Sequence, residues 1–269
     1  MPAADPTDLP SAASDLALLL DAAREAGVIA MNYFGKDPEV WMKGGTSPVS
    51  EADYAADKYL RTTLLAARPD YGWLSEETAD DPVRLSARRT FVVDPIDGTR
   101  GFLQGLDSWC VCVAVVEGGK TIAGVLECPA KQETYWAMPG EGAFLNGKAI
   151  SIRRDATPPL EIAGPKALID LLAPDWQRHL ARAPYIPSLA YRLAMVASGV
   201  LDATFVKPNA HDWDIAAADL ILREAGGQLV GQDGNSPTYA GEMIRHGALA
   251  AGSGALFAAM TEVIAQADF

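Results

Sequence analysis

The chain has 269 residues, of which 49% are hydrophobic and 21% charged, and its formal net charge is −13. This composition is typical of a globular protein with one large or two ordinary domains, and the negative charge argues against a nucleic-acid polymer as a partner. No stretch reaches the roughly 18 uncharged apolar residues of a membrane span and the N-terminus lacks the features of a secretory signal, so we expect a cytoplasmic protein without a membrane partner.

The N-terminal part predicts a lead-in followed by a helix. Residues 1–14 are expected to be disordered. Apolar residues recur at helical spacing in SDLALLLDAAREAGVIAMNYFG, residues 14–35. Ser14 is the expected N-cap of this helix and Gly35 the residue that stops it. These apolar residues form one stripe along the predicted helix.

A short strand and a second helix follow. VWMK, residues 40–43, predicts the strand, and GGTSPVSEAD, residues 44–53, predicts a mobile turn or loop. Ser50, with an acid three residues later at Asp53, matches a capping box. A helix is therefore expected over residues 51–67.

Two further segments end an apolar run with acidic residues. YGWLSEET, residues 71–78, predicts a strand that breaks into polar residues. FVVDPIDGTRGF, residues 91–102, predicts a strand that ends at Asp94 and Asp97. Its last residues, DGTRGF, resemble a helix start, where free backbone N–H groups and the helix dipole favour an anion such as phosphate.

SWCVCVAVVEGGKTIAGVLECP, residues 108–129, predicts two antiparallel strands joined at Gly118-Gly119. Cys110 and Cys112 lie two apart on the first strand and therefore on one face. Together with Cys128 they are too few, and odd in number, for a disulfide framework. Packing in the apolar core is favoured over a metal or redox role, which fits a reducing compartment.

The rest of the chain mixes strands and helices. Residues 133–150 predict another hairpin, and proline and charge concentrate at residues 153–160, which suggests a boundary. DWDIAAADLILREAGGQLV, residues 212–230, predicts a helix that ends at Gly226-Gly227 and then a strand. We therefore expect an α/β (α+β) layered fold. Its expected halves are an α+β metal-binding half over 15–152 and an α/β half over 153–269 that completes the site.

Five acidic residues stand at the ends of apolar elements: Glu76, Glu77, Asp94, Asp97 and Asp214. A group of buried carboxylates disfavours its own charge unless divalent cations compensate it, and oxygen ligands select Mg²⁺, Mn²⁺ or Ca²⁺. Two cations close together are typical of phosphoryl-transfer sites. The alternative is that Asp94 and Asp97 only start a turn and cap a helix. That alternative leaves Thr99 and the glutamate pair unexplained.

Four ordered blocks carry a family resemblance: SPVSEAD, WLSEET, DPIDGTRGF and WDIAAADLILREAGG. Together they resemble the signatures of the inositol monophosphatase superfamily, which comprises lithium-sensitive, Mg²⁺-dependent phosphatases. The resemblance covers roughly residues 15 to 260. It implies the αβαβα sugar-phosphatase fold, two or three Mg²⁺ ions per site with Mn²⁺ as a substitute, lithium inhibition, and a homodimer.

The resemblance also implies roles for single residues. Asp53 and Thr99 would orient and deprotonate the attacking water, with Glu76 as a further catalytic residue beside them. Hydrolysis would be direct, without a covalent phosphoenzyme. By itself, Asp53 is also explained as an acid in the first turn of a helix. The implied metal ligands are Glu76, Asp94 and the Ile96 carbonyl for one ion, Asp94, Asp97 and Asp214 for a second, and Glu76 for a weaker third.

Two residues are expected to support the site from behind the ligands. Glu77 is the neighbour of the ligand Glu76, and Lys43 corresponds to a basic residue on a mobile loop of the family. As a lone lysine, Lys43 would otherwise be explained as a solvated surface charge. The Gly98 and Thr99 amides would hold the phosphate.

The substrate is less sharply indicated. Arg100 and Arg192 stand where inositol monophosphatases carry neutral residues and bisphosphate nucleotidases tend to carry lysine. The two charges favour a 3′(2′),5′-bisphosphate nucleotide, unless both arginines pair with nearby acids. His211 and Asp212 are candidate contacts to substrate hydroxyls. The alternatives are myo-inositol monophosphate, then histidinol phosphate, and a non-catalytic binding protein as the other class.

Overall fold

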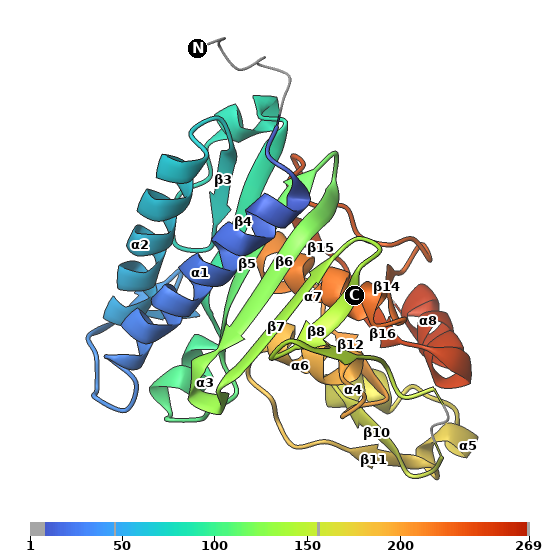
Figure 1. Cartoon of the computed structure of the whole chain (residues 1–269). Coiled ribbons are helices and arrows are strands. Elements are labelled where there is room, and N and C mark those ends of the chain that lie inside the picture. The colour runs from blue at the N-terminus through green and yellow to red at the C-terminus, as the bar shows by residue number, and fades with distance from the viewer. Residues whose placement is uncertain (1–8, 46, 155–156, 268–269) are drawn as a thin grey trace.

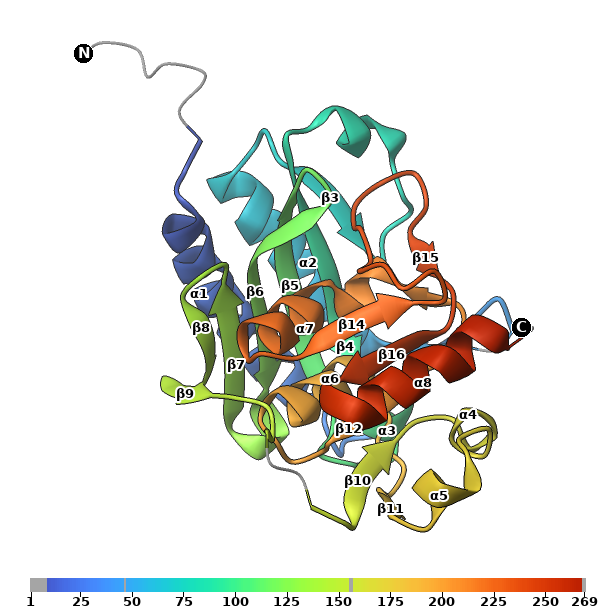
Figure 2. The ribbon, with the colours of Figure 1, turned by 90° about the vertical axis from the view of Figure 1, so that its right-hand side faces the viewer.

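The elements stack as helices, sheet, helices, sheet, helices, in a computed structural model that describes residues 9–45, 47–154 and 157–267 (Figures 1 and 2). This order confirms the expected αβαβα architecture. The outer helices on one side are α1 (Ala12–Met31) and α2 (Glu51–Ala67). The middle helices are α6 (Leu189–Ala197) and α7 (Asp212–Glu224). Beyond the second sheet lie α8 (Gly254–Gln266) and the short α4 (Lys166–Ile169) and α5 (Pro174–Gln177).

The first sheet has the strand order β3-β4-β5-β6-β7-β8-β9 and is antiparallel except for the parallel pair β3–β4. Both hairpins expected from the sequence are present in it. The strands are β3 (Gly72–Ser75), β4 (Arg89–Asp97), β5 (Cys110–Glu117), β6 (Lys120–Cys128), β7 (Glu133–Met138), β8 (Gly142–Leu145) and β9 (Lys148–Ile150).

The second sheet has the order β11-β10-β12-β16-β14 and mixes parallel and antiparallel pairs. Its strands are β10 (Leu160–Ala163), β11 (Leu180–Arg182), β12 (Ala203–Val206), β14 (Gln228–Gly231) and β16 (Leu249–Gly252). Smaller elements are β1 (Val40–Lys43) with β2 (Ser47–Ser50), β13 (Ala210–His211) with β15 (Arg245–His246), α3 (Thr99–Leu103), and the 3₁₀ turns Pro82–Ser86 and Pro129–Lys131.

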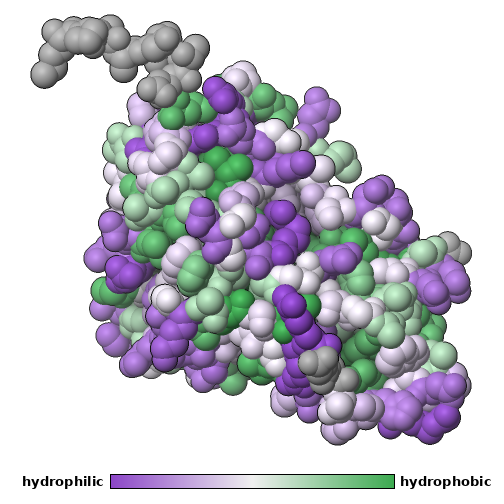
Figure 3. All heavy atoms as spheres, turned by 45° about the vertical axis from the view of Figure 1, so that its right-hand side comes forward, coloured by the Kyte–Doolittle hydropathy of each residue, from purple (hydrophilic) through white to green (hydrophobic). Residues whose placement is uncertain are grey.

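Strand β5 shows why the first sheet is covered on both faces. Val111, Val113 and Val115 pack in the cluster that contains the apolar residues of α1 and α2. The alternate residues, including Cys112 and Ala114, pack in the cluster that contains α6 and α7. A strand buried on both faces is a continuous apolar run, which is what the sequence shows here. The surface, by contrast, is a mosaic of hydrophilic and hydrophobic residues on the face in Figure 3.

The expected boundary at residues 153–160 falls where the chain passes from β9 in the first sheet to β10 in the second. Residues 155–156 of this segment, and residues 1–8 of the expected lead-in, lie outside the described residues. One hydrophobic cluster contains residues from Leu74 to Ala251 and so belongs to both halves. The middle helices therefore join the two sheets through a shared core.

The first helix begins earlier than its sequence pattern predicts. Its N-cap is Ser11, whose Oγ accepts a hydrogen bond from the Ser14 amide at 3.1 Å, so the assignment of Ser14 as N-cap was wrong. Asp15, in the first turn of the helix, is buried and accepts hydrogen bonds from Arg68 and Arg89, which are distant in sequence.

The segment predicted as a loop contains a strand. Residues 47–50 form β2 and pair with β1 in antiparallel register, while residue 46 lies outside the described residues. The Ser50 N-cap and the helix over residues 51–67 are confirmed. None of the helices in the described part of the chain is long and apolar enough to cross a membrane.

Helix α7 packs closely on β6 at Gly124, where a Cβ would lie 3.1 Å from both the Cα and the carbonyl oxygen of Ala217. We expect Gly124→Val to lower the free energy of unfolding by about 1–3 kcal/mol, because α7 must move away from the sheet. Urea unfolding measures this. Gly241, which has open space around it, is the matched control, and Gly241→Val should change stability by less than about 0.5 kcal/mol. Equal effects of the two substitutions would contradict the close packing.

Candidate metal and phosphate site

A β-bulge brings Asp94 and Asp97 to one face of β4. In a regular strand two residues three apart point to opposite faces. Here Asp94 is opposite Cys112 and Asp97 is opposite Cys110, so one extra residue is accommodated between the two pairs. Bulges of this kind re-aim side chains beside functional sites. Both carboxylates consequently share the face of the sheet that packs on α7.

Asp214 of α7 completes a group of three carboxylates. One oxygen from each of Asp94, Asp97 and Asp214 lies within 4.8 Å of the other two. Burial and then the neighbouring charges, Glu76 first, raise the pKa of Asp94 well above its ordinary value. Burial also raises the pKa of Asp97, and that of Asp214 to about 7. The protein alone thus disfavours the negative charge that it concentrates here, and hard divalent cations fit such an all-oxygen set.

Backbone amides at helix starts hold two of these carboxylates. Asp97 Oδ2 accepts hydrogen bonds from Ser188 Oγ and from the Ala190 amide, each at 2.6 Å, at the start of α6. Asp214 is the third residue of α7, and its Oδ2 accepts from the His211 amide at 2.7 Å. These bonds leave other lone pairs for a cation and fix the direction of each carboxylate.

Asp53 and Thr99 form a hydrogen-bonded pair beside the carboxylates. Asp53 Oδ2 accepts from the amide and the hydroxyl of Ser50 at 2.8 and 2.6 Å. Its Oδ1 lies 3.0 Å from Thr99 Oγ1, which also lies 3.0 Å from the Ile96 carbonyl oxygen. Burial, partly offset by the Ser50 bonds, raises the pKa of Asp53 to about 6. Asp53 is thus a carboxylate able to take up a proton near neutral pH.

Glu76, Glu77 and Lys43 form a second charged group at the end of β3. Lys43 Nζ lies 3.0 Å from Glu76 Oε1 and 2.7 Å from Glu77 Oε1. Burial raises the pKa of Glu77 to about 7, although the Lys43 hydrogen bond opposes the shift. The structure therefore places Glu76 against Lys43 and not within the group of three carboxylates.

The segment after Asp97 forms the start of α3. Gly98 is the N-cap with φ +95°, and a Cβ there would lie 3.1 Å from the Ser188 amide. Glycine is thus required both by the left-handed backbone and by the approach of α6. Ile96 is buried, and Arg100 is exposed on α3. The amides of Gly101 and Phe102 bond the Gly98 carbonyl oxygen, so the Thr99 amide precedes the first bonds inside α3 and by helix geometry has no carbonyl within the helix.

Arg192 lies on α6, the helix whose start binds Asp97. Its Nη2 donates to the Phe205 carbonyl oxygen at 3.2 Å, and its Nε is buried without a hydrogen-bond partner among the described residues. Burial lowers the pKa of Arg192, while the nearby Asp97 charge raises it. No carboxylate of the described chain lies within ion-pair distance of it, so the alternative that Arg192 pairs with an acid is not observed.

His211 and Asp212 differ from each other in what they can contact. His211 stacks on Trp213, and its Nε2 accepts from Arg245 Nε at 3.0 Å. Asp212 is fully buried; one oxygen accepts from the Ala240 amide and the other lies 2.7 Å from His246 Nε2. In this structure Asp212 holds the 239–246 segment and presents no free oxygen to a substrate hydroxyl.

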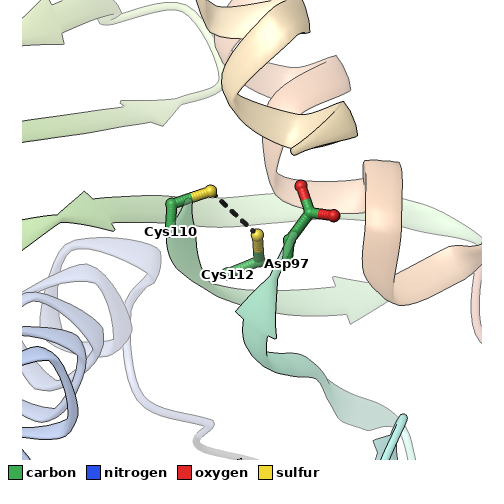
Figure 4. Close-up of side chains that lie close together, drawn as sticks. All are labelled: Asp97, Cys110 and Cys112. Carbon is green, nitrogen blue, oxygen red and sulfur yellow. Dashed lines mark hydrogen bonds between the residues drawn. The ribbon is translucent and has the colours of Figure 1, made fainter. Parts of the chain in front are cut away.

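Sequence reasoning missed two residues around the site: Ser188, which donates to Asp97, and Arg245, which donates to His211. Cys110, which was expected to pack in the core, is also the cross-strand neighbour of Asp97 (Figure 4). Only Ser188 has a local signal, because it precedes an apolar helical run and caps it, its Oγ accepting from the Tyr191 amide at 2.9 Å. Its bond to Asp97 spans 91 residues and no local pattern indicates it.

Comparison with known proteins identifies the family. The model of the inositol monophosphatase family matches residues 13–267. An inositol-1-monophosphatase of Mesorhizobium japonicum is 32% identical over an alignment of 270 positions, gaps included, which covers 93% of this chain and 95% of that protein. A histidinol-phosphatase of Mycobacterium tuberculosis is 31% identical over 242 residues, with coverage of 86% and 92%.

Solved structures agree with this assignment. The extragenic suppressor protein SuhB of Bartonella henselae superimposes with a TM-score of 0.83 at 28% identity, and the match covers 95% of this chain and all of that one. An inositol monophosphatase of Thermotoga maritima gives a TM-score of 0.81 at 26% identity, covering 94% and 97%. The fold is therefore shared over 94–95% of the chain.

The raised carboxyl pKa values predict how the metal-free protein responds to pH. The folded pKa values of Asp53, Glu77 and Asp214, about 6, 7 and 7, lie above the values of about 4 expected in the unfolded chain. Such groups stabilise the fold fully below about pH 4, and this contribution is lost as the pH rises through the folded values. In chelator we expect the free energy of unfolding to fall by at least about 2 kcal/mol between pH 5 and pH 8.

Urea unfolding across this pH range measures the effect. Asp214→Asn should flatten the slope because one titrating group is removed. A free energy of unfolding that rises steadily from pH 5 to pH 8 in chelator would show that the carboxylates are not destabilised by burial.

Proposed function

The chain belongs to the inositol monophosphatase family of phosphatases, and we propose that it hydrolyses a small phosphorylated metabolite with Mg²⁺, or Mn²⁺ in its place, bound at Asp94, Asp97 and Asp214. The observation that supports this most is the convergence of three buried carboxylates on one face of β4. None of the residues that the structure describes neutralises all three, and hard divalent cations would do so. Glu76 and the Ile96 carbonyl are the further proposed ligands, Glu76 by release from Lys43.

The cations would lower the pKa of the attacking water and offset the phosphate charge. The chain's own residues then provide the proton path. Thr99 Oγ1 donates to Asp53, so its lone pairs are available to accept a proton from water. Asp53, with a pKa raised to about 6, is the acceptor at the end of this path. Ser188 is buried and already bonded to Asp97, which supports direct attack by water over a covalent intermediate.

The phosphate itself would be bound at the start of α3. The Gly98 and Thr99 amides lie in a turn in which position 98 accommodates only glycine. Carboxylates with cations on one side and amides on the other suit a tetrahedral anion whose oxygens must be held in several directions.

For the substrate, we propose a 3′(2′),5′-bisphosphate nucleotide. Arg192 supports it, because this arginine is anchored by one carbonyl, leaves its buried Nε unpartnered, and lies near Asp97. A second phosphate would supply the missing acceptor with a charge-assisted hydrogen bond. Arg100, exposed on α3, is the second proposed contact, and His211 is a third, through its ring edge.

The relatives supply the comparison substrates. Proteins named inositol-1-monophosphatase and histidinol-phosphatase match most of this chain. Myo-inositol monophosphate, and after it histidinol phosphate, are therefore the second candidates. Comparing kcat/KM for adenosine 3′,5′-bisphosphate, inositol 1-phosphate and histidinol phosphate ranks the three. A non-catalytic binding role would instead give no magnesium-stimulated phosphate release from any of them.

Asp214→Asn should lower magnesium-dependent phosphate release by at least about a thousandfold, because a cation ligand from the α7 side is lost. The fold should remain, since one repelling charge is also lost. Asp94→Asn should behave alike. Asp21→Asn, at a position whose side chain is 84% exposed on α1, is the control and should keep full activity. Near-normal turnover by Asp214→Asn, with its melting temperature unchanged, would refute the ligand role.

Arg192→Ala should lower kcat/KM for adenosine 3′,5′-bisphosphate by about tenfold to a hundredfold, the effect of losing a hydrogen bond to a charged group. The same change should alter kcat/KM for inositol 1-phosphate by less than about threefold. Arg192→Lys keeps the charge and should recover part of the loss. Equal losses for both substrates would remove the support for a nucleotide.

A further inference from the structure

Beside the carboxylate group lies a second group of possible ligands with different chemistry. Oxygen and sulfur atoms of Asp97, Cys110 and Cys112 lie within 4.8 Å of one another (Figure 4). The two cysteines are alternate residues of β5, so both thiols point to the face of the sheet that carries Asp94 and Asp97. Asp97 is thus the one residue shared by an all-oxygen group and a sulfur-rich group.

The spacing of the thiols fits one coordinated ion. Cys110 Sγ and Cys112 Sγ are 3.6 Å apart. Two sulfurs at about 2.3 Å from a tetrahedral zinc ion are separated by about 3.8 Å. The two thiols therefore already lie near the spacing of two ligands of one ion, and an oxygen of Asp97 lies within 4.8 Å of both sulfurs.

A fourth ligand is at hand. Cys128 ends the neighbouring strand β6, where the pairing of Val111 with Glu127 sets it across from Cys110, and the three cysteines pack in the same cluster. All three cysteines are buried and none is in a disulfide. Three thiols and one carboxylate are a donor set that soft divalent cations prefer and that Mg²⁺ does not.

We propose that Cys110, Cys112 and Asp97 form a binding site for a thiophilic divalent cation, Zn²⁺ or Cd²⁺, with Cys128 as the additional ligand. The ion would enter from the carboxylate side, where the Asp214 side chain is 21% exposed. Each coordinating thiol releases its proton to solvent on binding. Because Asp97 serves both groups, a bound soft ion draws this carboxylate away from the magnesium ligands. Inhibition of the phosphatase rests on the proposed function, whereas binding does not.

Cadmium chloride added to the reduced, metal-free, full-length protein tests the site directly. Thiolate-to-cadmium charge transfer gives an ultraviolet absorbance that carboxylate ligands do not produce. The chain has three cysteines, all in this cluster, so any such band reports on it. We expect a band that saturates at one Cd²⁺ per chain, and no band with Mg²⁺. Absence of the band in the wild-type protein would overturn the proposal without any variant.

Variants separate the two ligand groups. Cys112→Ala and Cys110→Ala should each weaken Cd²⁺ binding by at least about tenfold, the effect expected when a metal centre loses a ligand or its support. Cys112→Ser, which keeps the side-chain size, serves if the alanine variant does not fold. Asp214→Asn is the matched control: it removes an oxygen-group ligand only and should leave the cadmium band and its midpoint within about threefold of wild type. A band lost in Asp214→Asn but kept in Cys112→Ala would overturn the assignment.

A third set of measurements tests whether Asp97 belongs to both ligand groups. Asp97→Asn should weaken Cd²⁺ binding by at least about tenfold, read from the same band. In the wild type, Cd²⁺ should inhibit magnesium-dependent phosphate release, and Cys112→Ala should need at least about tenfold more Cd²⁺ for the same fractional inhibition of its own activity. Tight Cd²⁺ binding that leaves phosphate release unchanged would overturn the sharing of Asp97. A protein without phosphatase activity that still shows the band would refute the proposed function alone.

Discussion

The structure depends on a cluster of like charges that the protein alone cannot stabilise. Asp94 and Asp97 are buried at the end of β4, and burial raises both pKa values because water no longer solvates the charge. The bulge in β4 is what forces the two together, since regular pairing would send them to opposite faces of the sheet. In the proposed function, divalent cations would supply the positive charge that keeps these carboxylates ionised.

Helix starts provide the partial compensation that the protein does contain. Asp53 is the third residue of α2, Asp214 is the third residue of α7, and Asp97 accepts the Ala190 amide at the start of α6. In each case backbone N–H groups and the positive end of a helix dipole favour the carboxylate, typically by 0.3–1 kcal/mol at a surface and more where partly buried. The layered fold thereby places the N-termini of three helices, α2 from the outer layer and α6 and α7 from the middle layer, beside these three carboxylates.

Local patterns predicted the elements, and long-range contacts decided the details. The helix over residues 51–67 and the Gly118-Gly119 hairpin follow from capping and turn residues that lie within a few positions of each other. The bond between Ser188 and Asp97, and the burial of Asp212 against the 239–246 segment, join positions far apart in the chain. No pattern in either segment contains that information. Asp94, Asp97 and Asp214, which were named from the family blocks, lie together, whereas the contact of Ser188 with Asp97 is visible only in the fold.

Asp97 links Arg192 electrostatically to the proposed metal site. A buried guanidinium without an ion pair is costly, and burial lowers its pKa, but the nearby Asp97 charge acts in the opposite direction. Asp97 therefore favours the positive charge of the arginine on the α6 side and, in the proposed function, would also hold metal ions on the α7 side. If metal ions take up the Asp97 charge, Arg192 loses part of its compensation and gains affinity for an anion. Metal binding and recognition of a second anionic group would then be linked through one carboxylate, so that the site attracts a substrate with two anionic groups only once its carboxylates hold metal ions.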